Sequence, residues 1–406
     1  MKSKLIKKIV CTSLVGIITV CGMTACSSNE KEKEVVVLNN QQDEINDVLS
    51  IKKIDEIDNF TGEAWLDNGK ILGIKNFSIS HENKKIPNIA IYDTNSGELQ
   101  TLSKNEDSGK TLLSTRDITK DERYVLYTKR FDWYSWDDSR NVYVIDLKTG
   151  EEKKIAEKVN TASGFLDENK IICSKGMELS IYDVDGNEEK VKLPDKLVEN
   201  LNDFNEYSFE KYLKLYYDGE SLDDKELKEA KERYQYEKEN NSIRFPSKKG
   251  DEILLETYTR APFVYNLKTK EYKVPTKTEA KKFYYHRDKP HTAKLEENAS
   301  GERELWELDE NGKHKKIIAK GDIRGSVQVS PDKTKVAYRV YGEKGEKNMF
   351  VYDFETEKSF KIFSQCVSEA YWDKDSNQFF MTSYKESDKG SQNPHDSYVT
   401  SVVTLN

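Results

Sequence analysis

The chain has 406 residues, of which 34% are charged and 36% hydrophobic, and its 73 acidic against 65 basic side chains give a net charge of −8. This acidity argues against nucleic acid as a partner, because phosphates require a basic surface. It also argues against direct docking onto an anionic lipid surface. The 11% of aromatic residues, mostly tyrosine, suit β-strands that have one face in water.

The first 26 residues have the order of segments found in an export signal. Lysines in the first eight positions precede a mostly apolar run, Ile9–Met23, and the sequence Met23-Thr24-Ala25-Cys26 then leads into a charged stretch. Small residues ahead of a cysteine resemble the lipobox of bacterial lipoproteins, although Met23 stands where that family usually has leucine. In that family the cysteine receives a diacylglycerol and becomes the first mature residue. The resemblance implies a signal peptide at residues 1–25 and lipidation of Cys26.

These features predict where the protein is located. Loss of the four signal lysines lowers the net charge from −8 to −12. No later stretch reaches the roughly 20 apolar residues that a membrane helix needs. We therefore expect the extracytoplasmic face of the cell membrane, with acyl chains as the anchor; a plain secretory signal or an N-terminal membrane anchor is the alternative. Residues 26–47 are polar enough for a flexible tether, although the run Val35–Leu38 could instead pair as a strand. This leaves residues 48–406 for the folded domain.

One hairpin pattern recurs along the folded domain. It reads IAIYDTNSGELQTL at Ile89–Leu102 and VYVIDLKTGEEKKI at Val142–Ile155, and weaker copies start at Leu179, Phe263, Leu305 and Met349. A second hairpin with an acidic turn precedes most copies, and both hairpins alternate apolar and polar residues with the period of a strand. Four strands in about 40–45 residues, repeated, are typical of a β-propeller blade.

The best-preserved first hairpin contains SPDKTKVAY at Ser330–Tyr338. This motif resembles the WD40-like PD40 repeats of TolB-type propellers, and the resemblance implies the fold more than any activity. We predict an all-β chain that forms a seven-bladed β-propeller of four-stranded antiparallel blades. The last blade shows only three strands, so we predict that Val48–Ile57 supplies its fourth strand. The predicted blades lie near residues 60–104, 115–157, 160–195, 241–276, 281–319, 323–363 and 366–406.

Residues 196–240 break the pattern. This segment has little strand character, and Ser221-Leu222-Asp223-Asp224 resembles a capping box at the start of a helix-rich run from Lys225. We predict a helical insertion between blades 3 and 4.

The longest irregular loops join the second and third strands of three blades that become neighbours when the ring closes. They are Asn76–Asn88, Arg130–Asn141 and Lys385–Ser397. Loops gathered on one face of a rigid scaffold predict a binding rim. Its candidate residues are Trp133, Tyr134 and Trp136 for flat aromatic contact, Asp132, Asp137 and Asp138 for polar contact, and His81 and His395 on the other two loops. The alternative is that the aromatic side chains only cover the end of the blade.

The sequence offers little support for catalysis. Cys173 and Cys366 are the only cysteines beyond Cys26, and neither belongs to a CxxC motif, so we expect buried free thiols. The acidic turns do not fit the spacing of a calcium loop, and there is no GxSxG elbow and no phosphate-binding glycine loop. Some PD40-type propellers are lyases with a His-rich metal centre, but the five histidines here are scattered: His81, His286, His291, His314 and His395. We therefore expect no catalytic residue, no metal and no cofactor.

These observations favour a non-catalytic, lipid-anchored propeller that recognises a protein, peptide or glycan through the loops of one face. The alternative is an extracellular carbohydrate-active enzyme, a lyase or glycoside hydrolase, with carboxylates at the central channel. A third possibility is a structural partner in an envelope complex, with residues 196–240 as the interface.

Overall fold

The computed structural model describes most of the chain after residue 50, and all of the described residues belong to one compact unit, Leu38–Asn406. The predicted signal peptide, Cys26 and the predicted tether lie outside the described residues. The described ranges are 51–76, 86–105, 112–130, 139–204, 207–217, 222–244, 248–258, 262–276, 279–280, 283, 292–298, 300–325, 327–342, 346–363, 368–384 and 398–405.

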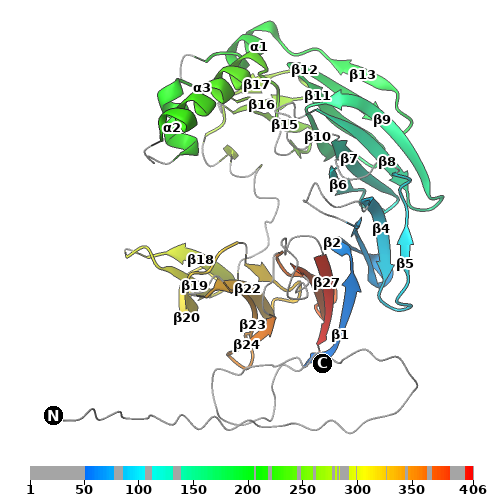
Figure 1. Cartoon of the computed structure of the whole chain (residues 1–406), viewed down its shortest axis with the longest axis vertical. Coiled ribbons are helices and arrows are strands. Elements are labelled where there is room, and N and C mark those ends of the chain that lie inside the picture. Colours follow the sequence, from blue (N-terminus) through cyan, green and yellow to red (C-terminus); the bar gives the residue numbers. More distant parts are fainter. Residues whose placement is uncertain are drawn as a thin grey trace, which may run out of the picture. The chain divides into compact units, whose positions relative to one another are not determined.

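The described residues form seven antiparallel sheets, six of four strands and one of three, which we number in chain order (Figure 1). Sheet 1 contains β2 (Phe60–Leu66), β3 (Lys70–Lys75), β4 (Asn88–Asp93) and β5 (Leu99–Thr101). Sheet 2 contains β6 (Leu112–Ile118), β7 (Tyr124–Arg130), β8 (Arg140–Asp146) and β9 (Glu151–Val159). Sheet 3 contains β10 (Thr161–Phe165), β11 (Lys170–Lys175), β12 (Glu178–Asp183) and β13 (Glu188–Val191).

The later sheets follow the same meander of neighbouring strands. Sheet 4 contains β14 (Lys248–Lys249), β15 (Glu252–Leu255), β16 (Phe263–Asn266) and β17 (Tyr272–Lys273). Sheet 5 contains β18 (Ala293–Glu297), β19 (Arg303–Leu308) and β20 (His314–Gly321). Sheet 6 contains β21 (Gln328–Val329), β22 (Lys335–Tyr341), β23 (Lys347–Asp353) and β24 (Lys358–Phe363). Sheet 7 contains β25 (Tyr371–Trp372), β26 (Gln378–Tyr384), β27 (Tyr398–Leu405) and β1 (Ile51–Asp58).

The recurring Asp or Asn of the sequence pattern closes the hairpin turn that follows it. Asp93 Oδ1 accepts the backbone N–H groups of Asn95 and Ser96, and Asp146 Oδ1 accepts those of Lys148 and Thr149. Asn266 closes its turn in the same way. These short side chains satisfy backbone donors that the turn leaves free. The backbone hydrogen bonds also lower the pKa of Asp93, so the repeated carboxylate is a turn-forming residue.

Apolar side chains pack between consecutive sheets. Sheets 1 and 2 share a cluster that includes Leu72 and Val125, and sheets 6 and 7 share one that includes Val351 and Phe379. Further clusters join sheet 2 to sheet 3, sheet 3 to sheet 4, and sheet 5 to sheet 6. In each of these pairs, the two sheets therefore bury apolar side chains of their strands against each other.

The N-terminal strand β1 completes sheet 7, as the sequence predicted. It pairs antiparallel with the C-terminal strand β27, with Ile54 opposite Val403 and Ile57 opposite Thr400. Sheet 7 also packs against sheet 1 through Phe380, which lies in a cluster with Phe60. This pairing gives β27 a partner on its outer side and joins the two ends of the domain.

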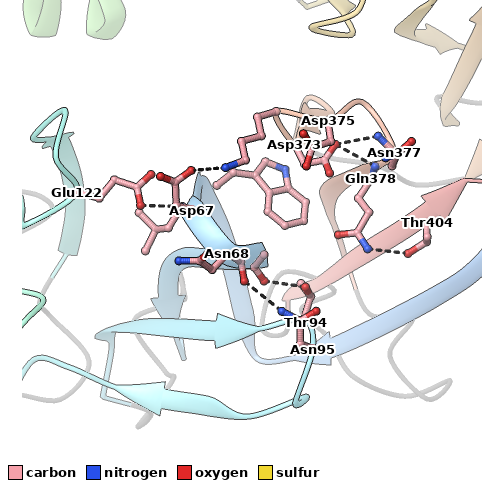
Figure 2. A pocket seen from close by; sticks show the side chains of 14 residues that line it. Asp67, Asn68, Thr94, Asn95, Glu122, Asp373, Asp375, Asn377, Gln378 and Thr404 are labelled. Atoms are coloured by element: carbon pink, nitrogen blue, oxygen red, sulfur yellow. Dashed lines mark hydrogen bonds and ion pairs between the residues drawn. The ribbon is translucent and has the colours of Figure 1, made fainter.

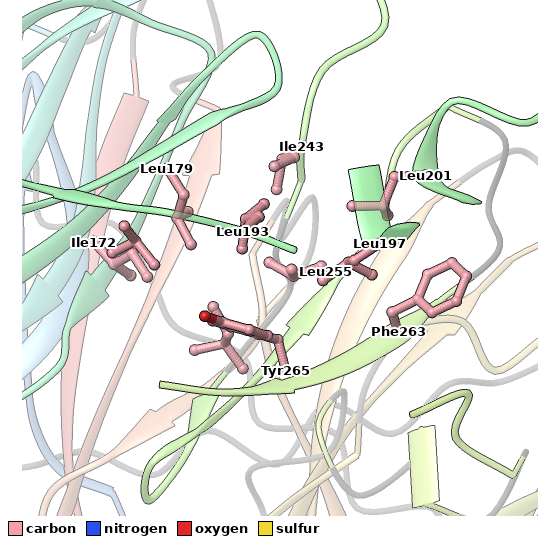
Figure 3. Close-up of a cluster of buried hydrophobic side chains, with 11 residues drawn as sticks. Ile172, Leu179, Leu193, Leu197, Leu201, Ile243, Leu255, Phe263 and Tyr265 are labelled. Atoms are coloured by element: carbon pink, nitrogen blue, oxygen red, sulfur yellow. The ribbon is translucent and has the colours of Figure 1, made fainter. Parts of the chain in front are cut away.

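Three helices lie between β13 and β14, where the sequence predicted helices: α1 (Asp195–Leu201), α2 (Phe209–Tyr216) and α3 (Asp224–Glu239). Helix α1 places Leu197 and Leu201 in the buried cluster between sheets 3 and 4 (Figure 3). No helix in the described residues is long and apolar enough to cross a membrane.

The capping box of α3 differs from the prediction. Asp223, rather than Ser221, caps the helix: its side chain accepts the N–H of Glu226, and the Glu226 side chain accepts the N–H of Asp223. The shift of two residues places a carboxylate, which complements the positive helix N-terminus, at the capping position.

Replacement of the fully buried Thr400 by valine tests the junction between sheets 7 and 1. Thr400 Oγ1 accepts the N–H of Gly62 at 2.9 Å and donates to the carbonyl oxygen of Phe60 at 2.7 Å. We expect Thr400→Val to lower the free energy of unfolding by about 1–3 kcal/mol, because both bonds are lost in a buried site. Urea denaturation measures this change. The control is Thr404→Val on the half-buried end of the same strand, and equal losses in both variants would contradict the prediction.

Candidate functional site

The predicted binding rim lies outside the described residues. This applies to each candidate side chain: His81, Asp132, Trp133, Tyr134, Trp136, Asp137, Asp138 and His395. Their role as a binding surface therefore stays a prediction. Cys366, His286 and His291 also lie outside the described residues.

The structure instead reveals a cavity of about 630 Å³ among the hairpin turns where sheets 7 and 1 meet. The turn between β2 and β3, the turn between β4 and β5 and the turn between β25 and β26 supply most of its lining, and sheet 2 adds Glu122 (Figure 2). The lining residues are Trp65, Leu66, Asp67, Asn68, Gly69, Thr94, Asn95, Glu122, Asp373, Lys374, Asp375, Asn377, Gln378 and Thr404.

Two turns of sheet 1 are bound to each other beneath the cavity. Thr94 donates to the carbonyl oxygen of Gly69 through both its backbone N–H and its hydroxyl, at 3.0 and 2.7 Å. The side-chain amide of Asn95 donates to the carbonyl oxygen of Asn68 at 3.1 Å. Asn68 has a φ of 62°, a left-handed conformation that asparagine tolerates better than most residues. This side of the cavity is therefore held in place by hydrogen bonds to two backbone carbonyl oxygens.

The turn of sheet 7 is fixed by Asp373. Its Oδ1 atom accepts the N–H groups of Asn377 and Gln378, both at 3.0 Å. Gln378 in turn donates to Thr404 Oγ1 at 3.2 Å. Burial raises the pKa of Asp373 above its usual value and the charge of Asp375 adds to this effect, although the backbone hydrogen bonds oppose it. Asp373 is thus a structural carboxylate at the wall of the cavity.

Two pairs of neighbouring sheets are joined at this level by turn-to-turn hydrogen bonds. The N–H of Asp332 in sheet 6 donates to Ser376 Oγ in sheet 7 at 2.9 Å, and the N–H of Asp67 in sheet 1 donates to Glu122 Oε2 in sheet 2 at 2.7 Å. The two acceptor residues, Ser376 and Glu122, both have a positive φ. They lie in the turn between β25 and β26 and in the turn between β6 and β7. Between sheets 7 and 1 the link is instead an ion pair, Lys374 Nζ to Asp67 Oδ1 at 2.8 Å.

The cavity carries more negative than positive charge. Four carboxylates line it, with Asp67 and Glu122 on one side and Asp373 and Asp375 on the other, and Lys374 is the only cation among the described residues of the lining (Figure 2). The hydrogen bond to Asp67 raises the pKa of Lys374, so this ammonium stays protonated near neutral pH. Trp65 adds an aromatic ring, whose indole N–H already donates to the carbonyl oxygen of Tyr371 at 2.6 Å. Such a lining can bind a polar ligand by charge and stacking.

The described residues offer no cluster of metal ligands. In these ranges no group of three or more His, Cys, Asp or Glu side chains is placed to hold a metal ion. His314, the one histidine in the described part of the chain, stacks on Trp306 at 4.4 Å and pairs with Glu296 at 3.1 Å. It is not among the residues that line the cavity. Cys173 is a free, buried thiol.

A buried carboxyl group lies on β2, apart from the cavity lining. Glu63 is partly exposed as a whole residue, but its Oε2 atom is buried without a hydrogen-bond partner. The register of β2 shifts between Gly62 and Ala64, which gives Glu63 the position of a bulge beside β6. Burial raises the pKa of Glu63 to about 7, against the opposing effects of the Thr115 N–H and the Arg116 charge.

The sequence did not indicate the cavity. Asp67 and Asp373 occupy equivalent turns more than 300 residues apart, and each is explained locally as a turn residue. The nearest signal was the prediction that the last strands close onto the first, since that closure brings the two turns together. It identified the junction but not a cavity within it.

No family model matches the chain, and no curated protein matches it significantly. Similar solved structures include the C-terminal WD40 domain of Sif2, at 13% identity and a TM-score of 0.45, with 89% of this chain and 100% of that chain covered. A prolyl endopeptidase has 12% identity, a TM-score of 0.40, and 81% of this chain covered; the chain spans 46% of its length. An oligogalacturonate lyase in complex with manganese has 11% identity and a TM-score of 0.28, with 86% of this chain and 77% of that chain covered. Similarities of this degree carry no inference about the activity of this chain.

Alkylation tests the state of Cys173. Burial raises the pKa of this thiol to about 12, and the charge of Glu188 adds to the shift. We expect iodoacetamide at about pH 8 to leave Cys173 unmodified in the folded chain and to modify it in urea, because the thiolate is the reactive form. Mass spectrometry of the peptide that contains Cys173 measures the difference. Equal modification with and without urea would show that the thiol is accessible.

Replacement of Glu63 by glutamine tests its burial. Because the pKa of Glu63 is higher in the folded than in the unfolded chain, its contribution to stability is present below about pH 4.5 and is lost as the pH rises through about 7. Glu63→Gln should match the parent near pH 4 and exceed its free energy of unfolding near pH 8 by a value on the order of 3 kcal/mol. Urea denaturation at the two pH values measures this. Parallel pH profiles for both proteins would contradict the assignment.

Proposed function

We propose that the chain is a lipid-anchored, extracytoplasmic, seven-bladed β-propeller that recognises a protein, peptide or glycan without chemical conversion, and that the cavity between sheets 7 and 1 is its binding site. The observation that carries the proposal is the cavity itself. Its walls are three hydrogen-bonded turns, and its lining combines four carboxylates, several amides and one tryptophan.

The propeller is supported by the way in which the sheets are joined. Apolar clusters link sheets 1 to 2, 2 to 3, 3 to 4, 5 to 6, 6 to 7 and 7 to 1, and β1 completes sheet 7 beside β27. In this proposal each sheet is one blade, and the three helices between β13 and β14 form an insertion between blades 3 and 4. Closure by strands from both ends of the chain suits a ring without open edges.

The location is proposed from the sequence before residue 50. The signal segment and the lipobox-like Met23-Thr24-Ala25-Cys26 favour a diacylglycerol anchor on Cys26. With an acyl anchor the folded domain stays outside the cytoplasmic membrane, tethered by residues 26–47. The predicted loop rim around Trp133 and Trp136 remains a second proposed contact site, on the evidence of its composition alone.

Recognition fits the cavity better than catalysis. Two of its carboxylates are held by backbone donors: Glu122 accepts the N–H of Asp67, and Asp373 accepts N–H groups of its own turn. A general acid or base needs a carboxyl group that is free to exchange a proton with the substrate. A rigid, preformed lining is, by contrast, what lowers the cost of binding.

Partner capture by the intact lipoprotein tests the proposal. Asp375 is exposed on the turn of sheet 7, and Asp375→Tyr would fill the cavity while leaving the turn bonds of Asp373 in place. We expect crosslinked partners recovered from host membranes to fall at least about tenfold in this variant. The control Glu310→Tyr adds the same ring and removes the same charge on an exposed turn of sheet 5.

Two outcomes would overturn the proposal. Equal capture by the Asp375→Tyr variant and the parent would remove the cavity as the binding site. Breakdown of a bound glycan by the parent chain, lost in the same variant, would replace recognition by the catalytic alternative.

A further inference from the structure

We propose that the ligand group bound in this cavity is a cationic side chain, the ammonium of lysine or the guanidinium of arginine, on an extended segment of a partner protein, and that Lys374 occupies its place in the free chain. The inference rests on the proposed function, because it names the chemistry of the same site. It starts from the position of the Lys374 ammonium.

Lys374 shows that the cavity accepts a primary ammonium group. Its Nζ atom lies 2.8 Å from Asp67 Oδ1, across the junction between sheets 7 and 1. The other three carboxylates of the lining leave the site negative even with this lysine in place. A site that stays anionic with one cation bound attracts further cations and repels anions.

Lys374 is also easily displaced. Its side chain is 66% exposed and that of Asp67 is 60% exposed, so both charges keep most of their hydration in the pair. Exposed ion pairs of this kind contribute little to stability, because water and other ions replace each partner at almost no cost. A ligand cation can therefore take over Asp67 while Lys374 moves into solvent.

The rest of the lining favours a cation over a sugar. The side-chain amides of Asn95 and Gln378 already donate within the chain, to Asn68 and Thr404, and the Trp65 indole N–H donates to Tyr371. One N–H of each of these groups is thus engaged, and the same lining holds four carboxylates, which only accept hydrogen bonds. A sugar needs donors as well as acceptors, but an ammonium or guanidinium group needs only acceptors.

The ring of Trp65 can pack against the methylene groups of such a side chain. It is half-buried in the lining, and because its N–H is engaged, the ring offers only apolar and π surface to a ligand. The methylene groups of lysine or arginine pack on such a surface, and their charged ends are attracted to an aromatic face.

The site is preorganised for this ligand. The Asp67 backbone is held by Glu122 of sheet 2, and the turn of sheet 7 is held by Asp373. Binding then requires the exchange of one exposed lysine and no rearrangement of the turns.

Binding of a defined peptide to the full-length chain in detergent tests the inference. The probe is a fluorescent peptide of alternating lysine and glycine, and its twin with every lysine Nε-acetylated has the same length without the charge. We expect the lysine peptide to bind and the acetylated twin to bind at least about tenfold more weakly. An arginine–glycine peptide should bind like the lysine peptide.

Two substitutions act in opposite directions. Lys374→Met should tighten binding of the lysine peptide by about threefold, because it frees Asp67, and the double change Asp67→Asn, Asp375→Asn should weaken it by at least about tenfold. The control is Lys153→Met, which breaks another exposed pair at 2.8 Å, with Asp185, and removes the same positive charge away from the cavity. It should change binding by less than about twofold.

The outcomes separate the two proposals. Weaker binding in Lys374→Met than in Lys153→Met, or equal binding of the acetylated twin, would overturn the cationic ligand even if Asp375→Tyr still abolished partner capture. If the cavity variants keep both peptide binding and partner capture, both proposals are overturned.

Discussion

The pairing of β1 with β27 is the interaction on which the rest of the structure depends. The chain's first described strand becomes the outer neighbour of its last strand, with continuous register from Ile57 opposite Thr400 to Ile54 opposite Val403. Without β1, the strand β27 would expose a row of unpaired backbone groups. With β1 in place, Thr400 can bind Gly62 and Phe60 of sheet 1, and Phe380 can pack on Phe60. The two ends of the domain are then one packed junction, and the candidate site lies at its turn end.

The turns at that junction are also linked differently from the turns of two other neighbouring sheet pairs. Between sheets 6 and 7, and between sheets 1 and 2, a backbone N–H of one turn donates to a side chain of the next turn. Between sheets 7 and 1 the link is the exposed ion pair of Lys374 and Asp67, and a cavity lies beside it. The hydrogen-bonded turns at those two junctions are explained by the packing of neighbouring sheets. The junction between sheets 7 and 1 has no such explanation, which is why it carries the functional proposal.

Much of the fold was predictable because it is written in short-range patterns. The alternation of apolar and polar residues located the strands, and the Asp or Asn of each hairpin located its turn, as the backbone hydrogen bonds of Asp93 and Asp146 confirm. The missing strand of the last unit was found by the need to cover an edge. The capping box was displaced by two residues, because Ser and Asp both cap helices and only the geometry at Asp223 selects between them. The predicted loop rim with Trp133 and Trp136 stays a prediction.

The sequence by itself determined the β-strand pattern, the hairpin turns, the helical segment before residue 240 and the closing strand, because each depends on residues close together in the chain or on one strand's need for a partner. Only the tertiary structure revealed the cavity among the described residues that we propose as a binding site. The sequence does not distinguish the cavity residues Asp67, Asp373 and Glu122 from the many other acidic turn residues. Their difference arises from the contact between two sheets whose turns are more than 300 residues apart, and no local pattern records whether such a contact is filled by a hydrogen bond or left as a charged cavity.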